Sequence, residues 1–152
     1  MLARDGKLHL SHLKHIEESP LHYAHAVKGR EDTAAMLKGR VVHAWTLQEI
    51  KPAVWDGEKR GNAWKEYKAE AENAGMDIIT ASEWDEVRRM ADAVHGDAFA
   101  RDVLTACTER ETAIEWDRCG VPCAGRIDFH AADRSILGDL KTTVCAAPRK
   151  FL

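Results

Sequence analysis

The hydrophobic period of the chain changes at Glu111, and this change limits the folds that the chain can adopt. Before Glu111, apolar residues recur at helical spacing, as in residues 36–47. After it, Thr112, Ile114 and Trp116 alternate with mostly charged residues, which is typical of a strand with two different faces. We therefore expect an α+β fold, in which a helical N-terminal half precedes a small, mainly antiparallel sheet.

Capping and breaking residues divide the chain into elements. Ser19 before Pro20 predicts a helix start, as does Thr33, and Ser82 is the expected cap of a helix that begins at Glu83. The expected helices cover residues 11–18, 20–27, 34–50, 63–74, 83–95 and 98–106, with short strands at 53–55 and 78–80. Turns at Gly120-Val121-Pro122 and at 131–135 then separate three strands of an antiparallel meander.

Two strand-like runs near the end of the chain place three charged side chains among apolar ones. Asp128 lies in the run 125–129, and Asp139 and Lys141 lie in the run 136–141, so antiparallel pairing would bring Asp128 close to Asp139. Strand alternation puts Asp139 and Lys141 on one face. Ion pairing alone explains these charges poorly, because desolvation opposes it. A divalent cation held by two carboxylates explains them better, and an ordinary hairpin with exposed charges is the alternative.

Three further side chains could join this group. His43 follows Gly39 by one helical turn, and a glycine there would let another element approach the helix closely. Glu111 and Glu115 share one face of the strand that is expected to lie beside the Asp128 strand. A lone helical histidine is more often a core or surface residue, and a solvated strand face explains both glutamates equally well.

Composition bounds the partners and the compartment. The length of 152 residues predicts one domain over residues 1–152, and the net charge of −3 argues against a broad polyphosphate-binding surface but not against local basic clusters. The absence of a long apolar run or a signal-peptide pattern predicts a cytoplasmic protein without a membrane partner. Cysteines 107, 119, 123 and 145 lack C-x-x-C spacing, so we expect reduced, small buried residues rather than cluster ligands.

Together these stretches resemble the PD-(D/E)xK nuclease superfamily. The resemblance rests on Gly39-Arg40-Val41-Val42-His43, Glu111, Gly125-Arg126-Ile127-Asp128 and Asp139-Leu140-Lys141-Thr142-Thr143. It is closest to the phage exonuclease VIII (RecE-like) branch, which is related to lambda exonuclease and the RecB nuclease domain. It spans nearly the whole chain and implies a restriction-endonuclease-like core.

The resemblance also implies a site for Mg²⁺ or Mn²⁺. It makes Asp128 and Asp139 catalytic metal ligands, and Lys141 the catalytic group that orients or deprotonates the attacking water. The further ligands that it implies are His43, Glu111 and the carbonyl of Leu140, and the implied DNA contacts are Arg40, Arg126, Thr142 and Thr143.

The activity that the resemblance implies is that of a Mg²⁺-dependent deoxyribonuclease, a phage or prophage recombination exonuclease acting 5′ to 3′ on linear duplex DNA. The implied partners are DNA ends, a single-strand annealing protein and further copies of the chain in an oligomer. Family members continue after the lysine strand into a helix with a Gln-x-x-x-Tyr motif, so we expect the C-terminal part of the fold to be missing beyond Leu152. The alternative is a nuclease-like module that binds DNA ends or a partner without cleaving.

Overall fold

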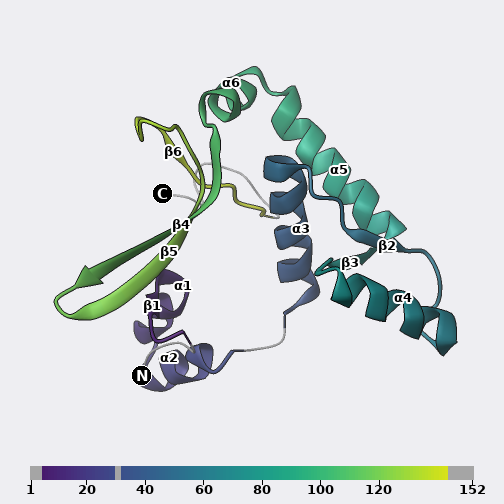
Figure 1. The fold of residues 1–152 in the computed structure, drawn as a ribbon, viewed down its shortest axis with the longest axis horizontal. Coiled ribbons are helices and arrows are strands. Elements are labelled where there is room, and N and C mark those ends of the chain that lie inside the picture. The colour runs from purple at the N-terminus through teal and green to yellow at the C-terminus, as the bar shows by residue number, and fades with distance from the viewer. Residues whose placement is uncertain (1–4, 30–31, 144–152) are drawn as a thin grey trace. The chain divides into compact units, whose positions relative to one another are not determined.

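The computed structural model describes residues 5–29 and 32–143, which form two compact units. The first unit combines the described residues up to Asp32 with Ala106–Asp139, and the second combines Thr33–Thr105 with the residues from Leu140 onward. The chain therefore changes units within its Asp-x-Lys motif. Helices fill much of the first half and strands follow, so the predicted α+β class is confirmed (Figure 1).

The first unit is built on a long hairpin. Strands β4 (Glu109–Arg118) and β5 (Val121–His130) pair in antiparallel fashion along their whole length, as Figure 1 shows. Strand β6 (Leu137–Gly138) continues the predicted meander on the other edge of β5. Strand β1 (Leu8–His9) pairs with β5 in parallel, which was not predicted because two residues are too few to show a period.

Short helical segments complete the N-terminal part of this unit. They are α1 (Leu10–Leu13), the 3₁₀ turn η1 (Lys14–Ile16) and α2 (Pro20–Val27). The predicted start of α2 is confirmed, because the Ser19 hydroxyl accepts a hydrogen bond from the His22 amide at 3.2 Å.

The turn of the hairpin differs from the predicted one. Val121 and Pro122 already belong to β5, so the loop consists of Cys119 and Gly120, with φ angles of 55° and 79°. Positive φ at both central residues gives the turn a backbone twist that matches the right-handed twist of the flanking strands. The prediction of a turn at Gly120-Val121-Pro122 was wrong, because a strand tolerates proline near its start.

Strand β6 ends earlier than predicted. Phe129 pairs with Gly138, and a Cβ atom at position 138 would overlap the edge of the Phe129 ring, so only glycine fits there without movement. Residues from Asp139 to Thr143 are not strand, so the prediction that strand alternation places Asp139 and Lys141 on one face was wrong. The backbone leaves the sheet directly after the glycine.

The second unit pairs two long helices. Helix α3 (Ala34–Gln48) packs against α5 (Ala81–Gly96), and α6 (Ala98–Ala106) follows (Figure 1). Strands β2 (Ala53–Trp55) and β3 (Ile78–Thr80) pair in parallel, with α4 (Gly61–Asn73) as the crossover helix between them. None of the described helices combines the length and apolar composition needed to cross a bilayer.

The core of this unit lies between the helices and β3. Val41, Val42, Ile79 and Val87 are buried together. Leu37, Trp45, Trp84 and Leu140 are partly buried against that cluster. Leu140 thus anchors the segment after Asp139 on the α3–α5 pair.

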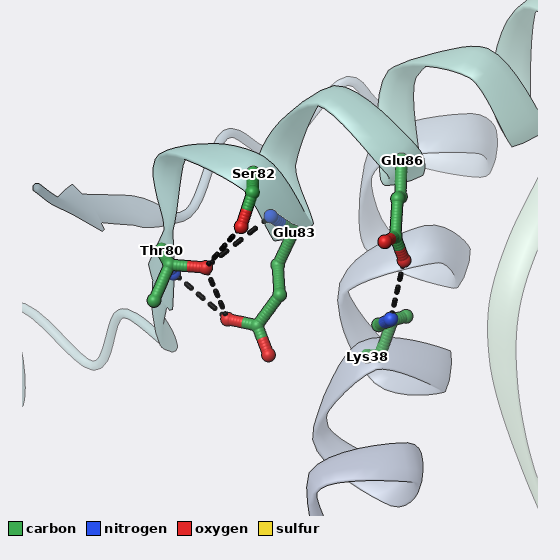
Figure 2. A network of polar contacts seen from close by, with 5 residues as sticks. All are labelled: Lys38, Thr80, Ser82, Glu83 and Glu86. Atoms are coloured by element: carbon green, nitrogen blue, oxygen red, sulfur yellow. Dashed lines mark hydrogen bonds and ion pairs between the residues drawn. The ribbon is translucent and has the colours of Figure 1, made fainter.

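Polar contacts define the start of α5 and tie it to α3 (Figure 2). The Thr80 hydroxyl accepts a hydrogen bond from the Glu83 amide at 3.2 Å, and the Glu83 carboxylate accepts one from the Thr80 amide at 2.8 Å. Thr80 is therefore the cap, and the prediction of Ser82 was wrong, although the reciprocal bonds fit the usual capping box. Lys38 on α3 forms an ion pair with Glu86 on α5.

The described cysteines are free thiols. Cys107 and Cys123 are buried, as predicted, but Cys119 is exposed in the hairpin turn, where its burial was wrongly predicted. Cys145 lies outside the described residues.

The Phe129–Gly138 contact gives a first prediction. The substitution Gly138→Ala should lower the free energy of unfolding by about 1–3 kcal/mol, because the new methyl group must displace the Phe129 ring. Urea denaturation measures the loss. Gly125→Ala on the same β5 strand is the matched control, because its Cβ would meet Trp116 at an ordinary 3.5 Å. Equal losses for both variants would contradict this role of Gly138.

The capping box gives a pH-dependent prediction. The hydrogen bond from the Thr80 amide holds the pKa of the Glu83 carboxyl below its ordinary 4.5. A lowered pKa in the folded state stabilises the fold above pH 4.5, and this contribution is lost as the pH falls through the folded-state pKa. Glu83→Gln should therefore lower the free energy of unfolding by up to about 1 kcal/mol at neutral pH, with a smaller difference in acid.

Denaturation curves recorded across the acid range measure this difference. Glu66→Gln, at an exposed site on α4, controls for the loss of one negative charge. A difference between wild type and Glu83→Gln that does not change with pH would rule out the ionised carboxylate as its cause.

Candidate metal centre

Two carboxylates from neighbouring strands meet on the hairpin of the first unit. Glu111 lies between the Arg110–Phe129 and Thr112–Ile127 pairs, and Asp128 occupies the corresponding place on β5. Oxygen atoms of the two carboxylates lie within 4.8 Å of one another, and both residues are half-buried. Two half-buried carboxylates at this separation repel each other unless a cation lies between them. Such oxygen donors suit a hard divalent cation such as Mg²⁺ or Mn²⁺.

The backbone of Glu111 is strained. Its φ angle is +48°, in the left-handed region that glycine adopts at low cost and glutamate does not. The other described non-glycine residues with positive φ lie at a helix end or in turns, namely Glu49, Cys119 and Arg134. Such a conformation inside a strand costs about 1–3 kcal/mol and occurs most often at functional sites.

Arg126 forms an ion pair with one carboxylate of this pair. Its Nη1 atom lies 3.5 Å from Oε2 of Glu111, and its side chain is 68 % exposed. An ion pair this exposed contributes little to stability, and most of the Arg126 side chain is accessible to a ligand from solution. Arg126 therefore places a positive charge beside the two carboxylates.

Asp139 directly follows the last paired residue of β6, since Phe129 pairs with Gly138 and Asp139 itself is not strand. In the described part of the chain, however, its carboxylate does not join Glu111 and Asp128 within the 4.8 Å limit. The structure thus brings Glu111 together with Asp128, while the approach of Asp139 to Asp128 stays a prediction.

The other predicted ligands belong to the second unit. His43 is half-buried on α3, one turn after Gly39. Leu140 packs against the helix core, while Lys141 and Thr143 are exposed. The predicted close approach at Gly39 is present, because a Cβ atom there would lie 3.2 Å from Oγ1 of Thr142.

Arg40 and Glu115, two further candidate residues from the sequence, contact other charged side chains. The Arg40 guanidinium donates to both carboxylate oxygens of Asp77, at 2.8 Å and 2.7 Å. The Glu115 carboxylate forms an ion pair with Lys7 and is 63 % exposed. Of the two glutamates that the sequence places on this strand face, only Glu111 therefore lies beside Asp128.

Sequence reasoning missed His130, two residues after Asp128. It is buried, with Nδ1 at 2.7 Å from the Ala131 carbonyl and Nε2 at 3.1 Å from the Thr112 hydroxyl. Nδ1–H donates to the carbonyl, and the hydrogen bond between Nε2 and the Thr112 hydroxyl ties β5 to β4. No spacing in the sequence separates such a histidine from a surface one.

A half-open groove of about 470 Å³ also lies in this unit, and neither Glu111 nor Asp128 lines it. Its lining is mostly apolar and comprises Thr112, Ile114, Glu115, Trp116, Ile127, His130, Arg134 and Leu137. The groove and the carboxylate pair are therefore separate features of the same hairpin.

Comparison with known families supplies the context for these residues. Residues 9–152 match the model of a PDDEXK-like domain of unknown function (DUF3799), and the match includes every candidate site residue named above. A search of curated proteins found no significant match. The predicted PD-(D/E)xK relationship and its nuclease-type fold are thereby confirmed. This chain belongs to the family of PDDEXK-like domains of unknown function.

Proposed function

We propose that this chain is a metal-dependent exonuclease that hydrolyses phosphodiester bonds of linear duplex DNA. The observation that carries the proposal is the Glu111–Asp128 carboxylate pair, held on neighbouring strands in a chain with a nuclease-type fold. Phosphodiester hydrolysis requires an activated water and neutralisation of the charge that develops on the phosphate. The 5′ to 3′ direction, the role in phage recombination, the annealing partner and the oligomer follow from the RecE-like resemblance alone.

The proposed ligands for Mg²⁺ or Mn²⁺ are Glu111, Asp128, Asp139, the Leu140 carbonyl and His43. Four of them are oxygen donors, which both cations prefer, and the imidazole nitrogen favours Mn²⁺ over Mg²⁺. The bound cation supplies Lewis acidity, which lowers the pKa of a coordinated water and offsets negative charge on the phosphate. Activity should therefore reach half its maximum at a lower concentration of Mn²⁺ than of Mg²⁺.

The remaining roles belong to side chains that reach solvent. The exposed Lys141 ammonium is proposed to orient the attacking water and to donate hydrogen bonds to the phosphate. Arg126 is proposed to contact a backbone phosphate, which its guanidinium matches in geometry. Arg40 would exchange Asp77 for a phosphate, and the exposed Thr142 and Thr143 would donate hydroxyl hydrogen bonds to the DNA backbone.

The first test is hydrolysis of end-labelled linear duplex DNA with Mg²⁺, Mn²⁺ or EDTA. Asp128→Asn should lower the rate about 100-fold or more, because it removes the charge of a central ligand while keeping its shape. Asp92→Asn on the exposed face of α5 is the matched control and should leave the rate unchanged. Substrates labelled at the 5′ or the 3′ end report the direction, and a closed circular duplex should resist.

Each result bears on the proposal. Cleavage that persists in EDTA, or that Asp128→Asn leaves intact, would overturn the metal-dependent mechanism. Nicking of the closed circle would replace the exonuclease with an endonuclease. DNA retained in a gel shift without any cleavage would identify a binding module instead.

The strained backbone at Glu111 gives a second test. In EDTA, Glu111→Gln should raise the free energy of unfolding because it ends the repulsion with Asp128. Glu111→Gly should raise it further, by about 1 kcal/mol, because glycine adopts the +48° φ angle without strain. Both variants should bind Mn²⁺ more weakly than wild type, as measured by electron paramagnetic resonance.

The comparison of the two variants separates the causes. A gain in stability shared equally by both would leave charge repulsion as the sole effect. Wild-type Mn²⁺ affinity in Glu111→Gly would remove Glu111 from the proposed ligand set.

A further inference from the structure

We propose that Gly39 is a positioning residue, which sets the place of Lys141 by letting Thr142 lie directly against helix α3. The inference rests on the proposed function, in which Lys141 acts at the reacting phosphate and the Leu140 carbonyl binds the metal. All of the contacts that carry it lie within the second unit.

The segment that bears Lys141 has an anchor on each side. Before it, Leu140 packs against the buried cluster formed by Val41, Val42, Ile79 and Val87. After it, Oγ1 of Thr142 lies 3.2 Å from the place that a Cβ atom at position 39 would occupy. Lys141 itself is exposed and lies between these two anchors.

The second anchor depends on the absence of a side chain. A 3.2 Å approach is tighter than ordinary carbon contacts, so a methyl group at position 39 would push Thr142 outward by a few tenths of an ångström. Thr142 adjoins Lys141 in the chain, and the displacement would pass to its backbone and to the Leu140 carbonyl. His43 lies one helical turn from Gly39 on the same face of α3, so the glycine fixes the distance of this segment from the helix that carries a proposed ligand.

The glycine has no other evident role on α3. Its φ is not in the left-handed region, and glycine inside a helix is less favourable than alanine. Gly39→Ala should therefore leave the melting midpoint unchanged or raise it, while it impairs the site. A loss of activity without a loss of thermal stability would separate a positioning role of Gly39 from a general contribution to folding.

The test measures the effect of Gly39→Ala in three backgrounds of the full chain: wild type, Thr142→Ala and Thr142→Val. In the wild-type background, kcat on linear duplex DNA should fall about tenfold with little change in KM, because small displacements of reacting groups slow the chemical step. Mn²⁺ affinity, read by electron paramagnetic resonance, should weaken as well. In the Thr142→Ala background both effects should nearly vanish, because the crowded atom is gone. In the Thr142→Val background they should persist, because a valine methyl group replaces Oγ1.

Several results would overturn the inference. Equal effects of Gly39→Ala in all three backgrounds would show that the two residues do not act through their contact. Unchanged kcat and Mn²⁺ affinity, or a lower melting midpoint that Thr142→Ala does not restore, would do so as well. If wild type hydrolyses DNA in these cases, the proposed function stands without the positioning role. If wild type neither hydrolyses DNA nor binds Mn²⁺, the proposed function fails first.

Discussion

The ladder between β4 and β5 is the interaction on which the candidate site depends. Its register sets Glu111 opposite Asp128, and the two-residue turn at Cys119 and Gly120 fixes that register. A slip by one residue would turn each side chain to the other face of the sheet and separate the two carboxylates. His130 on β5 reinforces the same register through its hydrogen bond to the Thr112 hydroxyl on β4.

A close contact to a glycine lies on each side of the Asp-x-Lys motif. Before Asp139, Gly138 accepts the Phe129 ring, so β6 can end close to β5. After Lys141, Thr142 lies against Gly39, on a helix that is distant in sequence. Each compact unit thus holds one end of the motif, and in each unit the contact is possible because a side chain is absent. Substitutions of these glycines by alanine therefore test the placement of the motif without changing any charge.

Much of this arrangement could be predicted from the sequence, because capping residues and hydrophobic periodicity determine local structure where tertiary contacts do not override them. Ser19 and Thr33 mark helix starts that the structure has, and alternation after Glu111 identifies the long strand. The antiparallel pairing of β5 with β6 follows from the short polar connection between them. Thr80 and Ser82 carry the same capping group two residues apart, and the sequence does not reveal which one the Glu83 carboxylate reaches.

Other features depend on contacts that no local pattern encodes. The pairing of β1 with β5 joins residues far apart in sequence, and the end of β6 depends on the Phe129 ring. The left-handed backbone of Glu111 has no signal at all, because glutamate does not favour it. Candidate site residues could therefore be named from the sequence, but their geometry could not. The chemistry of metal binding restricts the type of residue more than it restricts the backbone conformation.

The conformation of Glu111 also bears on how relatives of this chain can be compared. A glutamate that strains its own strand is retained by selection only while its carboxylate is useful, because other residues fit the same backbone better. A lineage that stopped using metal would drift toward glycine or asparagine at this position without losing the hairpin. Under the proposed function, the residue at position 111 would distinguish relatives that retain the metal ligand from relatives that retain only the fold.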